Sequence, residues 1–135
     1  MHKQKNVNFI YARLTIATLN VNTLKTEERE EELNIALENV HYDIIGLCEI
    51  RRLGEAIIEK DNGDIFCYKG ETKGQRGVGF LIKNKLKHMI TEIVGVSERI
   101  MILKLEASNC KITIIQIYAP QKTAAKKKSR ISTLS

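Results

Sequence analysis

Two segments decide the fold: LTIATLN at residues 14–20 and DIIGLCE at residues 43–49. Each contains a run of apolar and β-branched side chains, which is typical of buried strands. Between them, Thr26 can cap a helix whose first turns are rich in glutamate. Apolar residues then follow at helical spacing, at Leu33, Ala36, Leu37 and Val40. We therefore predict a strand, a helix over about 27–40 with one apolar stripe, and a second buried strand over 44–48.

After a looser stretch through residues 61–63, the pattern changes to short strands separated by glycine, asparagine and serine turns. We predict these strands near residues 64–69, 77–82, 88–94, 99–106 and 111–118, the last two forming a hairpin. A strand–helix–strand unit followed by a run of strands predicts an α+β fold, built as one mixed sheet with one main helix.

The positive charge lies mainly at the ends of the chain. The net charge is +6, yet residues 121–135 alone carry five basic and no acidic side chains. We predict a polar arm over residues 1–12 and a basic disordered tail over 121–135. Such a tail binds DNA, RNA or other acidic surfaces without choosing among them. The run from Lys126 to Arg130 could serve as a nuclear address or a DNA contact, or simply be solvated.

The remaining composition excludes several classes of protein. The apolar runs are too short to span a bilayer, and the N-terminal stretch is too soon interrupted by Arg13 for a signal peptide. The three cysteines, Cys48, Cys67 and Cys110, have neither disulfide-framework nor zinc-site spacing, so reduced and mostly buried thiols are expected. We expect an intracellular protein without membrane contact, with a nuclear location favoured over a cytoplasmic one.

Polar side chains follow both strands of the first unit. Asn20 and Asn22 end the first strand, and Glu49 follows the second. A strand–helix–strand crossover makes parallel strands, whose carboxyl ends meet at one sheet edge, the usual place for a ligand. One carboxylate beside amide groups suits Mg²⁺, which takes its other ligands from water and phosphate. The alternative is that both asparagines cap turns and Glu49 is a surface acid.

A resemblance to a known family favours the first reading. The motifs are LNVN (19–22), LCE (47–49), GVGFLI (77–82) and IYAP (117–120). In this order they resemble the endonuclease/exonuclease/phosphatase superfamily, which is DNase-I-like and includes the endonucleases of LINE-type retrotransposons. Residues 51–54 and 68–75 look especially like the craniofacial development protein 2-like sequences derived from such elements. The match spans about residues 13–120.

The resemblance implies a role for each matching residue. Glu49 would hold the metal, Mg²⁺ or Mn²⁺, and Asn20 would help to organise the metal and the scissile phosphate. Asn22 occupies the second position of the same motif, on the substrate side. Tyr118 would reach the phosphate through its hydroxyl, although a half-buried strand-end tyrosine is the alternative. Arg99, before a strand, is a less diagnostic substrate contact.

The resemblance also implies what is absent. The family places an Asp-x-Asn pair and a Ser-Asp-His motif downstream of Tyr-Ala-Pro, and residues 121–135 contain no Asp, Glu or His. The expectation is the N-terminal half of a four-layer DNase-I-like sandwich, a truncated Mg²⁺-dependent phosphodiesterase that is inactive as this chain and binds DNA weakly. A sheet without its partner would expose an inner face from residues 100–103 and 112–117, favouring self-association. The alternatives are a non-enzymatic binding remnant and an unrelated doubly wound domain.

Overall fold

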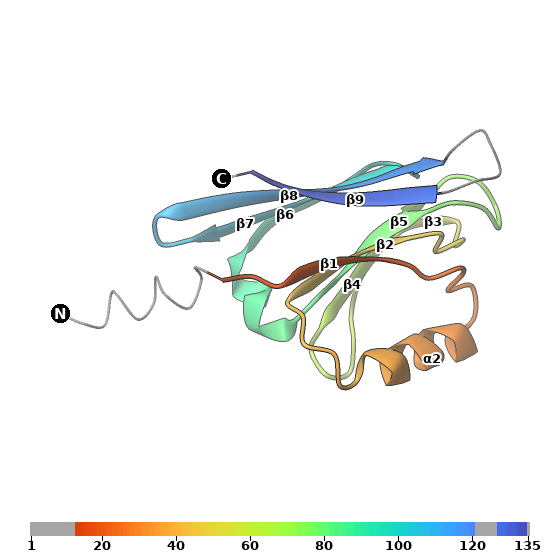
Figure 1. The fold of residues 1–135 in the computed structure, drawn as a ribbon, viewed down its shortest axis with the longest axis horizontal. Coiled ribbons are helices and arrows are strands. Elements are labelled where there is room, and N and C mark those ends of the chain that lie inside the picture. Colours follow the sequence, from red (N-terminus) through yellow and green to blue (C-terminus); the bar gives the residue numbers. More distant parts are fainter. Residues whose placement is uncertain (1–12, 121–126, 135) are drawn as a thin grey trace.

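The computed structural model describes residues 13–120 and 127–134, which form an α+β fold in three layers: helix, sheet and sheet (Figure 1). The first sheet contains β1 (Ile16–Asn20), β2 (Ile44–Cys48), β3 (Gly54–Glu59), β4 (Ile65–Gly70) and β5 (Val78–Ile82). The second contains β6 (Ile90–Ser97), β7 (Ile100–Ala107), β8 (Cys110–Pro120) and β9 (Lys127–Leu134). The helix α2 (Glu27–Leu37) lies on the first sheet, and the 3₁₀ helix η1 (Asn84–Met89) links the two sheets.

The strand order of the first sheet is β1-β2-β5-β4-β3, and that of the second is β6-β7-β8-β9. β1 and β2 are parallel, as the crossover predicted, with Asn20 opposite Cys48. The other neighbours in both sheets are antiparallel, including the predicted hairpin of β7 and β8. The first sheet is therefore mixed, and its parallel pair directs two strand ends to one edge.

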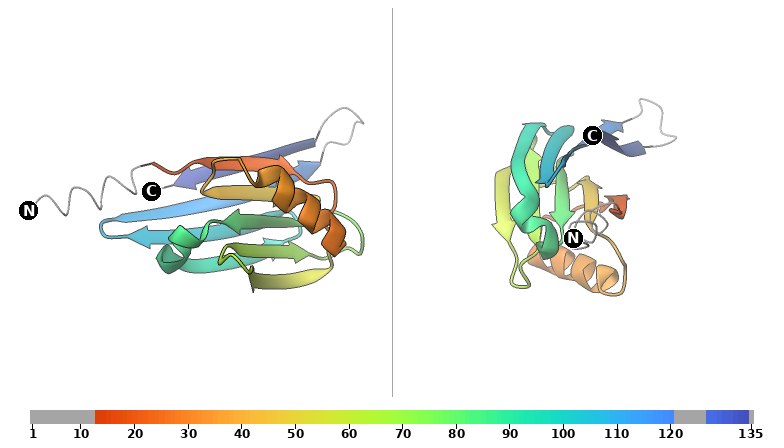
Figure 2. Two further views of the ribbon diagram at one scale, coloured as in Figure 1. Left: turned by 90° about the horizontal axis from the view of Figure 1, so that it is seen from below. Right: turned by 90° about the vertical axis from the view of Figure 1, so that its left-hand side faces the viewer.

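The prediction of a single sheet is wrong, because the later strands form a second sheet that packs on the first (Figure 2). Met101, Leu103 and Ile114, which we expected on an exposed inner face, are at most 1% exposed between the sheets. They pack with the inward side chains of the first sheet, such as Phe80 and Cys67. The described strands thus cover their own inner face, and the reason for expecting self-association through it is removed.

A second, smaller core lies between the first sheet and α2. Ile45, Leu47, Phe66 and Leu81 face the helix side and are buried there together with Leu24 and Tyr42. β2 is buried along its whole length because the second sheet covers one of its faces and this core covers the other. This confirms the prediction of a strand that is apolar on both faces.

The helix begins as predicted and ends early. The Oγ1 of Thr26 accepts a 3.2 Å hydrogen bond from the amide of Arg29 and caps the first turn. Leu33 and Leu37 pack on the sheet, but the helix stops at Leu37 rather than near residue 40, and Val40 is 48% exposed. The predicted apolar stripe is therefore only partly used, and the acidic face of α2 is solvated.

Three further predictions differ from the structure, because the pairing of strands decides these segments. β1 is an edge strand whose side chains are half-buried or exposed, rather than a buried strand. β3 was missed because its largely exposed residues form a strand only by pairing with β4. Residues 127–134, predicted as disordered tail, pair with β8 as β9. The predicted arm at 1–12 and the tail residues 121–126 and 135 lie outside the described residues.

The glycine-valine-glycine strand is structural, as predicted. A Cβ at Gly79 would lie 2.3 Å from the carbonyl oxygen of Cys67, so only glycine lets β4 and β5 pack at this point. Gly77 has a φ of +99°, which places it in the left-handed region that favours glycine. In the part of the chain that the structure describes, no helix is both long and apolar enough to cross a membrane.

Candidate functional site

The parallel pair carries Asn20 and Glu49 to the same edge of the first sheet. Its hydrogen bonding continues beyond the ends of β1 and β2: the amides of Val21, Thr23 and Leu24 donate to the carbonyls of Cys48, Glu49 and Ile50 at 2.8 to 3.1 Å. Each segment is thereby held against the other. The loop that carries Asn20 and the loop that carries Glu49 form one unit.

Glu49 lies at the centre of a polar cluster that joins three distant parts of the chain. The Nδ2 of Asn20 donates to Oε2 of Glu49 at 3.2 Å, and the hydroxyl of Tyr118 donates to Oε1 at 3.1 Å. Glu49 and Tyr118 are only 5% and 2% exposed. The structure therefore brings together the three residues that the sequence marked as catalytic, two from the first sheet and one from the second.

A guanidinium completes the surroundings of this carboxylate. The Nη2 of Arg51 lies 3.7 Å from Oε2 of Glu49. Burying an ionised carboxylate is costly unless opposite charge and hydrogen-bond donors compensate for it. Asn20, Tyr118 and Arg51 supply that compensation. Arg51 was not predicted as a site residue, and the signal that could have found it is its place two residues after Glu49.

The other two predicted residues stand at the margin. Asn22 is exposed, and its amide donates to Oδ1 of Asn20 at 2.9 Å, which fixes the orientation of the Asn20 side chain. Arg99 is also exposed, and its carbonyl accepts a 2.8 Å hydrogen bond from the amide of Tyr118. In the described structure, these two residues therefore contribute to the site through their backbones.

The backbone at this edge is strained. Among the described residues other than glycine, five have a positive φ: Asn22 (51°), Thr23 (103°), Glu49 (60°), Arg51 (62°) and Arg76 (54°). All five lie in the segments that surround Glu49. Such conformations cost on the order of 1–3 kcal/mol each, persist only where the surroundings enforce them, and cluster at functional sites. The strain marks this edge independently of any side-chain motif.

A third segment, the turn between β4 and β5, is tied to the same edge. The amide of Arg51 donates to the carbonyl of Arg76 at 2.7 Å. Glu98 fixes this turn: its carboxylate accepts hydrogen bonds from Oγ1 of Thr72 at 2.8 Å and from Nη1 of Arg76 at 3.2 Å. A Cβ at Gly74, in the same turn, would lie 3.7 Å from Nζ of Lys25. Three loops therefore meet at the Glu49 edge.

These loops carry a group of cations that we call the basic rim, made of Lys25, Arg51, Lys73 and Arg76. The basic rim was not predicted, since the positive charge was expected mainly at the two ends of the chain. Lys25, Arg51 and the turn that carries Lys73 and Arg76 are far apart in the sequence, and only the folded loops bring these three segments together. A buried carboxylate inside a rim of exposed or half-exposed cations suits a ligand that combines a metal ion with phosphate groups.

The donor set at Glu49 fits Mg²⁺ or Mn²⁺ in a limited way. Among the described residues, no three His, Cys, Asp or Glu side chains converge as a metal cluster. Glu49 supplies one carboxylate, whereas Asn20 directs its amide nitrogen toward that carboxylate and its amide oxygen toward the backbone of Asn22. Magnesium is commonly held by one or two carboxylates and keeps several waters, or takes substrate phosphate oxygens, for the rest. The site is thus suited to a hydrated ion shared with a phosphate.

No described histidine can serve as a base here. His41 precedes β2, whereas Glu49 follows it, and His88 lies in η1 after β5, whose last residue Ile82 pairs with Ile44 at the start of β2. Both therefore stand at the opposite end of the first sheet, roughly 15 Å away at 3.3 Å per strand residue. His2 lies outside the described residues.

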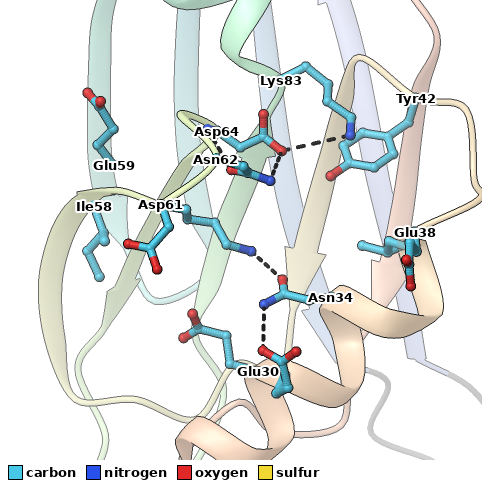
Figure 3. Close-up of a pocket in the computed structure, with 13 residues that line it drawn as sticks. Glu30, Asn34, Glu38, Tyr42, Ile58, Glu59, Asp61, Asn62, Asp64 and Lys83 are labelled. Carbon is cyan, nitrogen blue, oxygen red and sulfur yellow. Dashed lines mark hydrogen bonds and ion pairs between the residues drawn. The ribbon is translucent and has the colours of Figure 1, made fainter.

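A hollow of about 560 Å³ also lies at that opposite end, between α2 and the turn from β3 to β4 (Figure 3). Asp64 in its wall accepts from Nδ2 of Asn62 at 3.1 Å and lies 3.8 Å from Nζ of Lys83. Burial and the nearby Asp64 raise the pKa of Tyr42, another lining residue. The polar groups of Asp64 are used in shaping the turn, and none of the predicted site residues lies here.

Comparison with known proteins gives one distant relative. Over 84 residues the chain is 21% identical to craniofacial development protein 2 of Bos taurus. The match covers 62% of this chain and 14% of that protein, so the chain spans only a small part of the relative's length. No protein-family model matches the chain.

Proposed function

We propose that this chain contains the metal- and phosphate-binding part of a Mg²⁺-dependent phosphodiesterase domain of the endonuclease/exonuclease/phosphatase type, related to LINE-type retrotransposon endonucleases. In this proposal the chain binds DNA weakly and without sequence preference, and it does not hydrolyse DNA by itself. One observation carries the proposal: Asn20 and Tyr118 both donate to the buried carboxylate of Glu49, at a strained sheet edge.

The motif resemblance and the distant relative support the same assignment. The four motifs occur in the family's order, and the described ones supply Asn20, Glu49 and Tyr118 to one cluster. The similarity to craniofacial development protein 2 is weak but consistent with the motif resemblance. The three residues are far apart in the sequence, so a chance likeness would not be expected to unite them.

Each residue has a chemical role in the proposed site. Glu49 would hold the ion, and Asn20 would keep its carboxylate oriented. When bound, the ion would neutralise phosphate charge and activate water. Tyr118 can donate its hydroxyl to a phosphate oxygen in place of Glu49, and the basic rim would hold neighbouring phosphates by charge. No described histidine lies at this edge to abstract a proton, which is why we propose binding without hydrolysis.

A second candidate is a binding module that recognises nucleic acid without any metal. The basic rim favours it, because its four cations outnumber the three nearby carboxylates, those of Glu49, Glu71 and Glu98. The two candidates differ in a measurable way. A metal-dependent site loses affinity for DNA when the ion is removed with a chelator, whereas a purely cationic surface keeps it.

Manganese binding and DNA binding test the proposal together. Mn²⁺ titrations followed by electron paramagnetic resonance should show a site that Glu49→Gln removes and Glu59→Gln leaves intact. Glu59 is the matched control, since its ion pair with Lys87 is exposed and lies at the other end of β3. Equal Mn²⁺ binding in both variants and the wild type would disprove the proposed metal site.

A plasmid assay tests the hydrolytic part separately. With supercoiled plasmid and Mg²⁺, the chain should show no nicking above background, because no described histidine lies near Glu49 to take a proton from the attacking water. Nicking by the wild-type chain that disappears in Glu49→Ala would show that the chain is itself an active nuclease. Fluorescence anisotropy with a DNA duplex should show binding that weakens as salt rises.

A further inference from the structure

Arg52 contacts three segments of the structure that supports the site. Its Nε donates to the carbonyl of Leu24 at 2.5 Å, and its Nη2 donates to Oε1 of Glu30 at 2.7 Å. The guanidinium carbon lies 5.3 Å from the centre of the Phe66 ring and 5.5 Å from that of Tyr68. One side chain therefore joins the loop after β1, the helix α2 and the strand β4.

This side chain lies between the two strained loops. Asn22 and Thr23 have positive φ on one side, and Glu49 and Arg51 have positive φ on the other. The hydrogen bond to Leu24 fixes the end of the first loop, and the chain of Arg52 itself directly continues the second. The backbone of Arg52 has little freedom to move, since a Cβ at Gly70 of β4 would lie 1.9 Å from its carbonyl oxygen.

We propose that Arg52 is a positioning residue for the Glu49 site: its guanidinium locks the segment that carries Asn20 against the segment that carries Glu49. The proposal rests on the proposed function of that site in binding a metal ion. In this role Arg52 acts on the site through the backbone of the two loops. It keeps Asn20 in reach of Glu49 by holding the strained backbone between them, while α2 serves as the fixed support through Glu30.

The shape of the guanidinium is essential to this role. Two of its nitrogens donate in different directions, to Leu24 and to Glu30, while its plane lies near two aromatic rings. A lysine ammonium carries the same charge but has neither the planar fork nor a flat face for stacking. Arg52→Lys therefore separates the positioning role from the effect of charge alone.

Amide hydrogen exchange tests the lock without any metal. In Arg52→Lys and Arg52→Met, exchange of the Thr23 and Leu24 amides should accelerate about tenfold or more. The reason is that opening of this loop no longer requires the Arg52 contacts to be broken, so it costs less free energy. Amides of β5, in the centre of the sheet, should change much less. Lys104→Met is the matched control: it removes a cation from the exposed Lys104–Glu92 pair in the second sheet and should alter neither loop.

Mn²⁺ affinity then tests the consequence for the site. Arg52→Lys should weaken Mn²⁺ binding about tenfold, and Lys104→Met should leave it unchanged. Unchanged exchange at Thr23 and Leu24, or acceleration equal to that of β5, would overturn the positioning role. If the wild type binds no Mn²⁺, the proposed function fails, and the exchange pattern alone decides whether Arg52 locks the two loops.

Discussion

Tyr118 and Glu49 are separated by 69 positions in the sequence, and the hydroxyl of Tyr118 donates a 3.1 Å hydrogen bond to Oε1 of Glu49. This contact joins the end of β8 in the second sheet to the end of β2 in the first. It is buried at both residues, so its hydrogen-bonding partners are fixed by the protein rather than by solvent.

Removing this hydroxyl should destabilise the fold. Tyr118→Phe leaves the buried carboxylate with one donor fewer, and hydrogen bonds to charged groups contribute about 1.5–3 kcal/mol. Urea unfolding followed by circular dichroism would measure the change in the free energy of unfolding. Tyr42→Phe is the control: that ring is also buried and lies under Lys83, so it should change the free energy by less than about 0.5 kcal/mol. Equal effects of both variants would contradict the assigned hydrogen bond.

The fold should lose stability in acid through Asp43. Burial raises the pKa of Asp43, but hydrogen bonds from Lys85 and from the amide of Thr15, together with nearby positive charge, outweigh it and leave the pKa lowered. A carboxyl with a lowered pKa stabilises the fold above its ordinary value near 3.8 and loses that contribution as the pH falls below it.

Asp43→Asn should therefore be less stable than the wild type at pH 7, with a smaller further loss between pH 4 and pH 2. Urea midpoints at several pH values would show it. Lys85→Met should act in the same direction at pH 7, because it removes the cation 2.8 Å from Oδ1. An acid dependence identical to that of the wild type in Asp43→Asn would rule out this carboxyl as a source of acid sensitivity.

Replacing Gln116 with an apolar residue should stabilise the protein. Gln116 is 0% exposed in β8, and within the described structure neither atom of its amide has a hydrogen-bond partner. A buried polar group without a partner costs about 1–3 kcal/mol, so Gln116→Met should raise the free energy of unfolding by about 1 kcal/mol or more. Gln75→Met, at an exposed position, should have little effect. A lower melting temperature for Gln116→Met would show that the amide has a partner in solution.

The three thiols should differ sharply in reactivity. Burial raises the pKa of Cys67 to about 12, and Cys48 is buried as well, whereas Cys110 is exposed at the start of β8. Because the thiolate is the reacting form, a thiol-specific reagent should modify Cys110 rapidly and the other two only after unfolding. Cys110→Ser should abolish the fast phase. A second fast thiol in that variant would mean that a core strand opens readily.

The sequence predicts correctly those parts of the site whose position follows from the local pattern of strands and helix. The parallel β1–β2 pair and the meeting of Asn20 with Glu49 follow from a strand–helix–strand pattern alone. Tyr118 required more, since nothing local to β8 indicates which strand end it faces. Its placement beside Glu49 was expected from motif order rather than from spacing.

What the sequence could not supply depends on contacts between distant segments. Arg52, Arg76 and Lys25 cannot be recognised as neighbours of the site before the three loops are folded together. The positive φ of Thr23 is not indicated by any turn motif in the residues around it. The second sheet was missed for a similar reason. Alternating apolar residues in β7 and β8 indicate that one face is buried, but not that the first sheet of this chain covers it.

The inward position of Tyr118 follows from counting. Along β8 it shares a face with Ile114 and Gln116, all at even positions, while Ile115 and Ile117 occupy the opposite face. Side chains alternate between faces, so a single-residue insertion or deletion within β8 ahead of Tyr118 would turn the hydroxyl away from Glu49 and bring Ile117 or Ala119 toward it. Length changes in this strand can preserve the site only in steps of two, a constraint of parity that substitutions at Tyr118 itself would never reveal.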